Sequence, residues 1–406
     1  MNGSGRRRRG LLVLTSVAAV LATVSTGPTA AAKSQSQSKP QSKSQSQPQP
    51  QPQPQSADPL QQEVDAIHGT GAVGVFAEVT APGVRDSARA GTAEVGTGRA
   101  MPWNGRVRVG SATKTFTAAV VLQLVGEGRM SLEDSVDRWL PGVVRGNGND
   151  GRRITVRQLL QHTSGIRDVL PEIPALNTAD GYRAERFRTY TSEELVKLAM
   201  RHRPNFRPGA GWSYSNTNYI LAAMIINEVT GRSWAREVNE RIIRPLGLKD
   251  TSTPGSNPAI PGPHAQGYAA FGTGTGTGSG IDVTELNSSM AVGSGSIIST
   301  AHDLSRFYTA LLGGRLLAPA QLAEMTATKP APELGVRYGL GLGEIPLSCG
   351  GSYFGHPGEL LGYHTWGGVT RDGKRSAVVY TTSDGGPDTQ HAMSTLVDQE
   401  LCQARS

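Results

Sequence analysis

The chain has 406 residues, a formal net charge of +7 and two cysteines. All of the excess positive charge lies before residue 58, where no acidic residue occurs, so residues 58–406 are neutral overall. Because a neutral domain lacks the positive surface that attracts nucleic acids or anionic membranes, we expect neither as a partner.

The first 32 residues have the pattern of a signal peptide. Four arginines at 6–9 precede an apolar run over 11–24, and Thr29-Ala30-Ala31-Ala32 is a small-residue cleavage site. The run is too short and too rich in small residues to span a membrane comfortably. We therefore expect a secreted protein that is cleaved after Ala32 and has no stable membrane anchor. The export route, general or twin-arginine, stays open.

The next segment, 33–57, consists almost entirely of Ser, Gln, Lys and Pro. This composition cannot bury enough apolar surface to offset chain entropy, so it predicts a disordered linker. The folded domain is then expected over 58–406. Within it, the Gly-Thr tract at 273–280 predicts a mobile surface loop.

Strands are expected near both ends of the domain. The early strands are 71–79 and 88–95, with a turn at Pro82-Gly83, and the late strands are 363–369 and 376–382. Helices are expected between them, at 155–161, 192–201, 217–230, 234–243 and 300–312. This order predicts an α+β fold, in which an antiparallel sheet from both chain ends is flanked by helices and carries an inserted, mainly helical lobe.

A candidate nucleophile lies in the stretch Val109-Gly110-Ser111-Ala112-Thr113-Lys114. Ser111 comes at the start of an apolar run that continues to Val125, which predicts a helix buried in the core. Residues three apart share one helix face, so the Lys114 amine can reach the Ser111 hydroxyl. Burial disfavours the ammonium form, and Lys114 could then act as a base. On the local pattern alone, an N-cap serine with a solvated lysine is the favoured interpretation.

Two further triplets lie in loops that lead into regular elements. Tyr214-Ser215-Asn216 precedes the helix expected at 217–230, and His356-Pro357-Gly358 precedes the late strands. Each triplet alone is typical of a turn or a helix cap. They indicate a catalytic site only when taken together with Ser111 and Lys114, in this order along the chain.

Cys349 and Cys402 are expected to form a disulfide, because an even number of cysteines in an exported protein favours pairing. The bridge would close a loop of roughly fifty residues and contribute about 4 kcal/mol on the chain-entropy model. The sequence has no His-Glu-x-x-His, no Cys-x-x-Cys and no Gly-x-Ser-x-Gly. We therefore expect no metal, no cofactor and no α/β-hydrolase elbow.

In the order Ser-x-x-Lys, Tyr-x-Asn and His-x-Gly, the motifs resemble those of the penicillin-recognising serine hydrolases. The similar branch holds the class C β-lactamases and the secreted actinobacterial D-alanyl-D-alanine carboxypeptidases. The likeness extends to His162-Thr163-Ser164-Gly165 and Tyr338-Gly339-Leu340-Gly341-Leu342, and covers about residues 60 to 403.

The resemblance implies a covalent acyl-enzyme mechanism. Ser111 would carry the acyl group, while Lys114 and Tyr214 would form the base and proton relay. Which of the two takes the first proton stays open. The catalytic residues expected from the resemblance are therefore Ser111, Lys114 and Tyr214.

The resemblance also implies residues that bind the substrate. Asn216 would position the lysine and bind the substrate amide, and His356 would orient the tyrosine and add positive potential. The oxyanion hole would use the backbone N–H groups of Ser111 and Glu359, with Gly358 beside them in the third motif.

Several positions depart from the relatives that cut D-Ala-D-Ala. Those relatives bind the free carboxylate with threonines and an arginine, whereas this chain has Pro357, Glu359 and Gly343 at the corresponding positions. An aromatic wall residue of the relatives is here Met290. We therefore expect intact acylation machinery with altered recognition of a free carboxylate.

The sequence thus predicts a secreted serine hydrolase, most like a D-alanyl-D-alanine carboxypeptidase acting on peptidoglycan stem peptides. An esterase, a D-aminopeptidase or amidase, or a class C-like β-lactamase on the same fold are the alternatives, and a non-catalytic penicillin-binding protein is the other class. The expected partners are a small peptide, ester or β-lactam substrate, with peptidoglycan as a further partner.

Overall fold

The computed structural model describes residues 58–271 and 280–403. The expected signal peptide at 1–32 and linker at 33–57 lie outside these residues. The expected loop at 273–280 also lies outside them, apart from Gly280.

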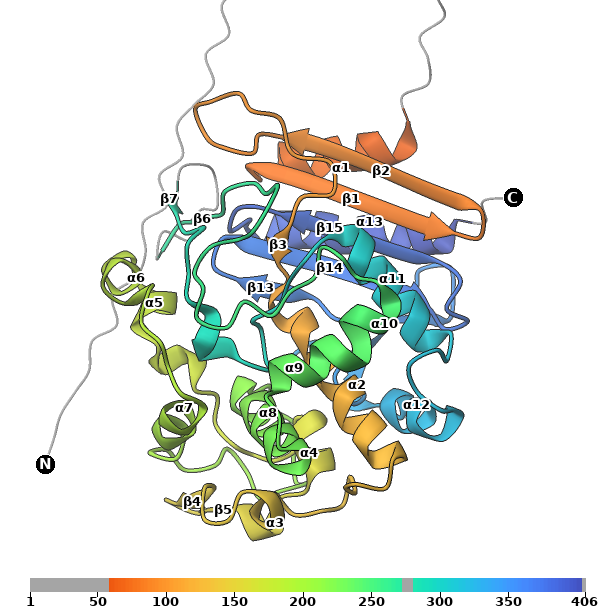
Figure 1. The fold of residues 1–406 in the computed structure, drawn as a ribbon. Helices are drawn as coiled ribbons and strands as arrows, with labels where there is room; N and C mark the ends of the chain where they lie inside the picture. The colour runs from red at the N-terminus through yellow and green to blue at the C-terminus, as the bar shows by residue number, and fades with distance from the viewer. Residues whose placement is uncertain (1–57, 272–279, 404–406) are drawn as a thin grey trace, which may run out of the picture. The chain divides into compact units, whose positions relative to one another are not determined.

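A large antiparallel sheet forms one layer of the fold (Figure 1). Within the described residues it has nine strands, in the order β2-β1-β15-β14-β12-β11-β10-β9, with β13 paired to β14. Their bounds are β1 Gly74–Ala81, β2 Val84–Gly91, β9 Lys329–Ala331, β10 Val336–Tyr338, β11 Gly343–Pro346, β12 Ser352–Gly355, β13 Gly358–Leu360, β14 Tyr363–Thr370 and β15 Ser376–Thr381.

The early and late strands pair with each other within this sheet, where β1 lies next to β15. Strand β1 pairs with β15 so that Val75 faces Thr381 and Thr80 faces Ser376. This pairing confirms the expected sheet from both chain ends. The second early strand was placed too late, because β2 starts directly after the Pro82-Gly83 turn and ends at Gly91.

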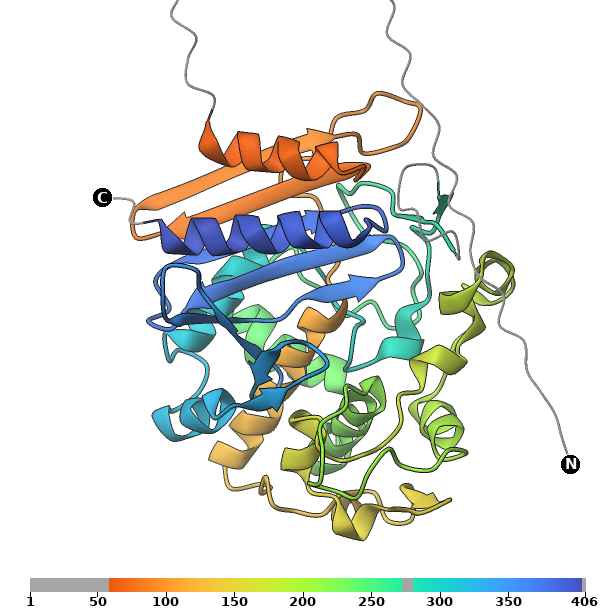
Figure 2. The same ribbon diagram turned by 180° about the vertical axis from the view of Figure 1, so that it is seen from behind.

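Two helices cover the outer face of the sheet, α1 (Pro59–Gly69) and α13 (Pro387–Cys402). Figure 2 shows them side by side across the strands. Strand β15 alternates accordingly: Ala377 and Val379 pack in the cluster with these helices, whereas Val378 and Tyr380 pack in the main core on the other face. This period of two is what a sheet covered on both faces requires.

The other face of the sheet carries α11 (Ala301–Leu312) and, beyond it, a mainly helical lobe (Figure 1). This arrangement confirms the predicted α+β fold. The remaining helices are α2 Thr113–Gly126, α3 Val136–Trp139, α4 Val156–Leu160, α5 Pro174–Asn177, α6 Ala179–Glu185, α7 Ser192–Ala199, α8 Asn216–Thr230, α9 Trp234–Val238, α10 Arg244–Leu246 and α12 Pro319–Thr326. Short two-stranded pairs are β3 Val107–Arg108 with β8 Ile298–Ser299, β4 Arg145–Gly146 with β5 Asn149–Asp150, and β6 Tyr268–Ala269 with β7 Ile281–Asp282.

Two helices, α2 and α8, form the centre of the lobe and pack against each other. Both are apolar on nearly every side, which is why they lie inside the core rather than on its surface. Helix α8 ends at Thr230 and is capped by Gly231, whose φ of +68° is the left-handed conformation that commonly terminates a helix. The short 3-10 turn that precedes α2, Gly110–Ala112, contacts β13 and β14 of the sheet.

Within the described part of the chain, no helix combines the length and the apolarity that crossing a bilayer requires.

Candidate active site

The nucleophile candidate lies in a 3-10 turn, Gly110–Ala112, immediately before α2. Ser111 is half-buried, and Lys114 follows it in the first turn of the helix. Their side chains meet as expected, with Nζ of Lys114 2.9 Å from Oγ of Ser111. The alternative of a solvated lysine is wrong, because Lys114 is fully buried.

The Lys114 amine has two further partners, both acceptors. Nζ donates to Oδ1 of Asn216 at 2.7 Å and to the carbonyl oxygen of Ser294 at 2.8 Å. Burial lowers the pKa of Lys114 to about 7, although the negative charge of Asp168 opposes this shift. A neutral amine whose two hydrogens point to Asn216 and Ser294 directs its lone pair at Ser111.

Tyr214 also reaches the hydroxyl of Ser111. It lies on the segment that leads into α8, and its phenol donates to Oγ of Ser111 at 2.7 Å. Burial raises the pKa of Tyr214, so the group is a neutral phenol over the physiological range. Nζ of Lys114 lies 4.7 Å from the centre of the tyrosine ring. The three expected catalytic side chains thus converge on one oxygen atom.

Asn216 begins α8 and is held by a residue that the sequence did not single out. Its Nδ2 donates to Oδ2 of Asp168 at 3.0 Å, and its backbone N–H donates to Oδ1 of the same carboxylate, also at 3.0 Å. Asp168 therefore orients the amide so that Oδ1 faces Lys114. Its only signal in the sequence is its place three residues after Gly165, the last residue of the motif His162-Thr163-Ser164-Gly165.

His356 is brought to the site, but the expectation of its positive potential is wrong. Burial, together with the charge of Lys114, lowers the pKa of His356 to about 3, so the ring is neutral. Its two ring nitrogens hydrogen-bond the phenol of Tyr338 at 2.9 Å and the carbonyl oxygen of Pro357 at 2.5 Å. His356 therefore faces Tyr214 through its ring, at a centroid distance of 6.2 Å, and not through a hydrogen bond.

Strand β13 passes directly over the nucleophile turn. A Cβ atom on Gly110 would lie 2.4 Å from the backbone nitrogen of Glu359, and one on Gly358 would lie 2.0 Å from the carbonyl oxygen of Val109. Both glycines are needed for this close approach. The contact brings the backbone of Glu359 beside that of Ser111, the pair expected to form the oxyanion hole.

A cavity of about 470 Å³ opens beside Ser111 and Tyr214. Two carboxylates line it, those of Glu333 and Glu359, and no lysine or arginine is among its described lining residues. The apolar part of its wall consists of Leu334, Val336, Ile345, Trp366 and Met393. The cavity is therefore suited to a cationic group and an apolar side chain rather than to a free carboxylate.

Of the positions at which this chain differs from the relatives, some line the cavity and one does not. Gly343 and Pro357 line the cavity, and Pro357 lies between β12 and β13, so its missing N–H removes no ladder bond. Met290, which takes the place of an aromatic wall residue of the relatives, is fully buried in the core and lies outside the residues that line the cavity.

Cys349 and Cys402 form a disulfide, as expected. It joins the connection between β11 and β12 to the last residue of α13. Helix α13 contributes Gln390 and Met393 to the cavity wall, so the bridge anchors an element of the site.

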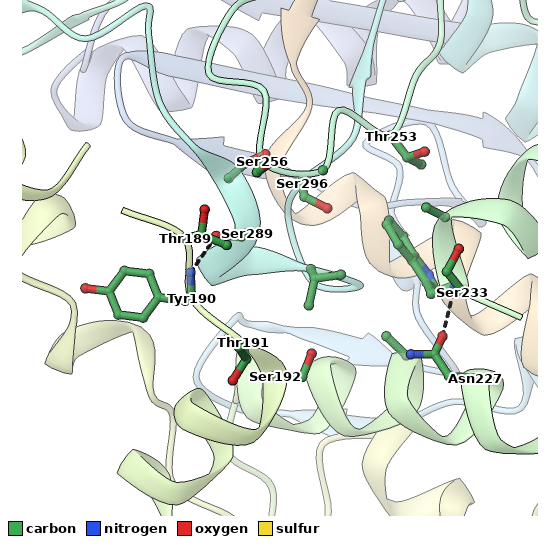
Figure 3. A pocket seen from close by; sticks show the side chains of 16 residues that line it. Thr189, Tyr190, Thr191, Ser192, Asn227, Ser233, Thr253, Ser256, Ser289 and Ser296 are labelled. Carbon is green, nitrogen blue, oxygen red and sulfur yellow. Dashed lines mark hydrogen bonds between the residues drawn. The ribbon is translucent and has the colours of Figure 1, made fainter. Parts of the chain in front are cut away.

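A second cavity, of about 310 Å³, lies elsewhere in the lobe (Figure 3). It lies between the start of α7, α8 and the start of α9, and hydroxyl groups such as those of Thr189, Ser289 and Ser296 line much of it. It shares no lining residue with the cavity at Ser111. In the described residues, no group of three His, Cys, Asp or Glu side chains could hold a metal ion.

Comparison with known proteins agrees with this geometry. The beta-lactamase family model matches residues 60–401. Penicillin-binding protein 4* of Bacillus subtilis (strain 168) is 30% identical over 229 residues, which are 54% of this chain and 48% of that protein. The chain thus spans about half the length of this curated relative.

Two solved structures are similar over most of both chains. A D-stereospecific amidohydrolase from a Streptomyces species has a TM-score of 0.78 and 44% identity, covering 84% of this chain and 98% of its own. The D-amino acid amidase from Ochrobactrum anthropi SV3, complexed with L-phenylalanine amide, has a TM-score of 0.74 and 29% identity, covering 84% and 96%. These matches confirm the resemblance drawn from the motifs. The chain belongs to the beta-lactamase family and is a serine hydrolase of the β-lactamase/transpeptidase fold.

Proposed function

We propose that this protein hydrolyses amide and ester bonds of D-aminoacyl compounds with a free ammonium group, through an acyl-enzyme on Ser111. The observation that carries the proposal is the charge of the cavity beside Ser111, where Glu333 and Glu359 are the charged side chains among the described lining residues. The similarity to a D-stereospecific amidohydrolase at 44% identity supports the same substrate class.

The first chemical step is proton transfer from Ser111 to neutral Lys114. The lone pair of Lys114 faces the hydroxyl because Asn216 and Ser294 take its two hydrogens. Oγ of Ser111 then attacks the substrate carbonyl carbon, and the backbone N–H groups of Ser111 and Glu359 stabilise the oxyanion. We therefore assign the role of first base to Lys114, and the high pKa of Tyr214 supports this assignment.

Tyr214 serves as the general acid in the second step. Its phenol lies 2.7 Å from Oγ of Ser111, the atom bonded to the reacting carbon, and this short distance supports its role in protonating the departing amine. The proton gained by Lys114 then restores the phenol. Water attacks the acyl-enzyme with the same groups as base, releasing the D-amino acid and regenerating Ser111.

Recognition is assigned to the two carboxylates and the apolar wall. Glu333 is held at the site because its Oε2 accepts the backbone N–H of Tyr214 at 3.0 Å. The Glu359 side chain is 72% exposed, and its Oε2 lies 4.0 Å from Nδ1 of His364. Since both carboxylates attract an ammonium group and repel a carboxylate, the D-alanyl-D-alanine carboxypeptidase activity expected from the motifs is the weaker proposal. Export through the segment 1–32 remains part of the proposal.

The test compares D-phenylalanine p-nitroanilide with its L-enantiomer, with its N-acetyl derivative and with a peptide that ends in D-Ala-D-Ala. We expect the free D-aminoacyl anilide to have the highest kcat/KM, and Ser111→Ala to abolish turnover. Glu333→Gln with Glu359→Gln should raise KM for the free amine by roughly tenfold, since two solvent-exposed charge pairs are lost. The same change should leave KM for the N-acetyl substrate unaltered. Preference for the D-Ala-D-Ala peptide would contradict the proposal.

A further inference from the structure

His162 occupies a backbone position that ordinarily belongs to glycine. It follows the C-terminal residues of α4, and its φ of +60° lies in the left-handed region. The N–H groups of His162 and Thr163 turn back to the carbonyls of Leu159 and Gln158, as at a helix C-terminus. A non-glycine side chain is strained there, and yet the ring of His162 is fully buried.

The contacts of His162 enclose Tyr214 on both sides along the chain. Its carbonyl oxygen accepts the N–H of Ser213 at 3.0 Å, and its ring Nδ1 accepts the N–H of Ser215 at 3.2 Å. One residue thus binds the backbone N–H groups of both chain neighbours of Tyr214. The imidazole also packs against the tyrosine ring, with centroids 4.4 Å apart.

The ring must be neutral and in one tautomer to make these contacts. Nδ1 accepts from the N–H of Ser215 and faces the amide Nδ2 of Asn218 at 3.2 Å, so the ring hydrogen is on Nε2. Nε2 is buried and has no hydrogen-bond partner among the described residues. Burial and the nearby charge of Lys114 keep the pKa of His162 well below its usual value, which agrees with the neutral form.

We propose that His162 is a positioning residue that holds Tyr214 with its phenol directed at Ser111, where the leaving amine must be protonated. The inference rests on the proposed function, in which Tyr214 is the general acid. His162 does not line the cavity. Its ring also packs against Tyr219 and Tyr338, but among the three catalytic side chains its ring contact is with Tyr214. Its loss should therefore affect substrates whose leaving group needs a proton.

The experiment uses one acyl group with two leaving groups. The p-nitrophenyl ester of D-phenylalanine releases a stable anion and needs little protonation, whereas D-phenylalanine amide must be protonated to leave. His162→Phe keeps the ring bulk and removes the acceptor. His162→Asn tolerates positive φ and places Oδ1 near the former Nδ1. We expect His162→Phe to lower kcat/KM for the amide at least tenfold more than for the ester, and His162→Asn to recover part of that difference.

A double-mutant cycle with Tyr214→Phe separates positioning from general destabilisation. If His162 acts through Tyr214, adding His162→Phe to Tyr214→Phe should change the amide reaction by less than twofold. Equal losses on ester and amide, or losses that multiply in the double variant, would overturn the inference.

A folding defect of His162→Phe, seen by circular dichroism, would move the comparison to His162→Asn against His162→Gly. Both of these suit the backbone and only asparagine keeps the acceptor, so equal amide-to-ester ratios would again overturn the inference. Failure of the proposed function has another signature: Ser111→Ala or Tyr214→Phe would leave amide hydrolysis intact.

Discussion

The carbonyl oxygen of Ser294 lies 2.8 Å from Nζ of Lys114, although 180 residues separate the two in the chain. Together with Oδ1 of Asn216, it takes up the hydrogens that a neutral lysine amine carries. The lone pair of the neutral Lys114 nitrogen then points towards the Ser111 hydroxyl. The backbone carbonyl of Ser294 thereby helps to orient the Lys114 amine towards Ser111.

The pH dependence of acylation should follow Lys114. Because its pKa is lowered to about 7 and the reaction needs the unprotonated amine, kcat/KM should rise about tenfold per pH unit below 7 and level off above it. Asp168→Asn removes a negative charge that favours the ammonium form, so the midpoint should move to lower pH. The measurement is the pH profile of kcat/KM, with exposed Asp180→Asn as the control. A midpoint that moves upward in Asp168→Asn would contradict the assignment.

Gly110→Ala should damage the oxyanion hole. The new Cβ would meet the backbone of Glu359, and φ at this position is +49°. Loss of one oxyanion donor typically lowers kcat about 100-fold or more, and we expect a loss of that order. Gly128→Ala, at the other end of α2, is the matched control, since it has φ +68° but open space around its Cβ. It should cost about 1 kcal/mol of stability and keep its activity. Equal activity of the two variants would refute the geometric argument.

The disulfide should stabilise the fold more than it affects the chemistry. Replacing both Cys349 and Cys402 by alanine frees a loop with a sequence separation of 53 residues, which should lower the free energy of unfolding by about 4 kcal/mol. Urea unfolding with and without a reductant is the measurement, and reductant should destabilise only the natural protein. A double variant as stable as the parent would show that the bridge contributes nothing.

Glu359 should discriminate against a free substrate carboxylate. The preference for the methyl ester of a D-Ala-D-Ala peptide over the acid should fall about 1.4- to fivefold in Glu359→Thr, because an exposed charge–charge interaction is worth about 0.2–1 kcal/mol. The ratio of the two kcat/KM values is the measurement, with Glu94→Thr, outside the cavity, as the control. An unchanged ratio in Glu359→Thr would remove this carboxylate from substrate recognition.

The order of strands and helices could be predicted from the sequence because each element has a local pattern of apolar and polar residues. Residues of β15 alternate between the two faces of the sheet, and α2 is apolar throughout because it lies inside the core. Both patterns can be recognised in the sequence, as can the preference of Pro82-Gly83 for a turn. The second early strand was misplaced by several residues, since β2 is largely solvent-facing and alternates weakly. Helix α9 continues into a π-helical turn, Asn239–Ile243, that no spacing rule indicated.

The sequence predicted those parts of the site in which the interacting residues are close together in the chain. Ser111 and Lys114 are three residues apart on a helix, so their contact follows from helix geometry. Tyr214 and Asn216 were found through the resemblance, and the fold brings them to Ser111. The sequence did not indicate three contacts of the site: those of Asp168 with Asn216, of Ser294 with Lys114, and of His162 with the segment around Tyr214. A lone aspartate, a carbonyl oxygen and a backbone φ leave no pattern in the sequence.

The sequence by itself determined the residue types of the reaction, the two cysteines that pair and the family of the fold. Only the tertiary structure decided the state and direction of those groups. His356 shows the difference: as a residue type it can carry a positive charge, but burial next to Lys114 keeps it neutral. Desolvation and hydrogen-bond geometry depend on what surrounds a side chain in space, and those surroundings come from segments that are distant in the chain.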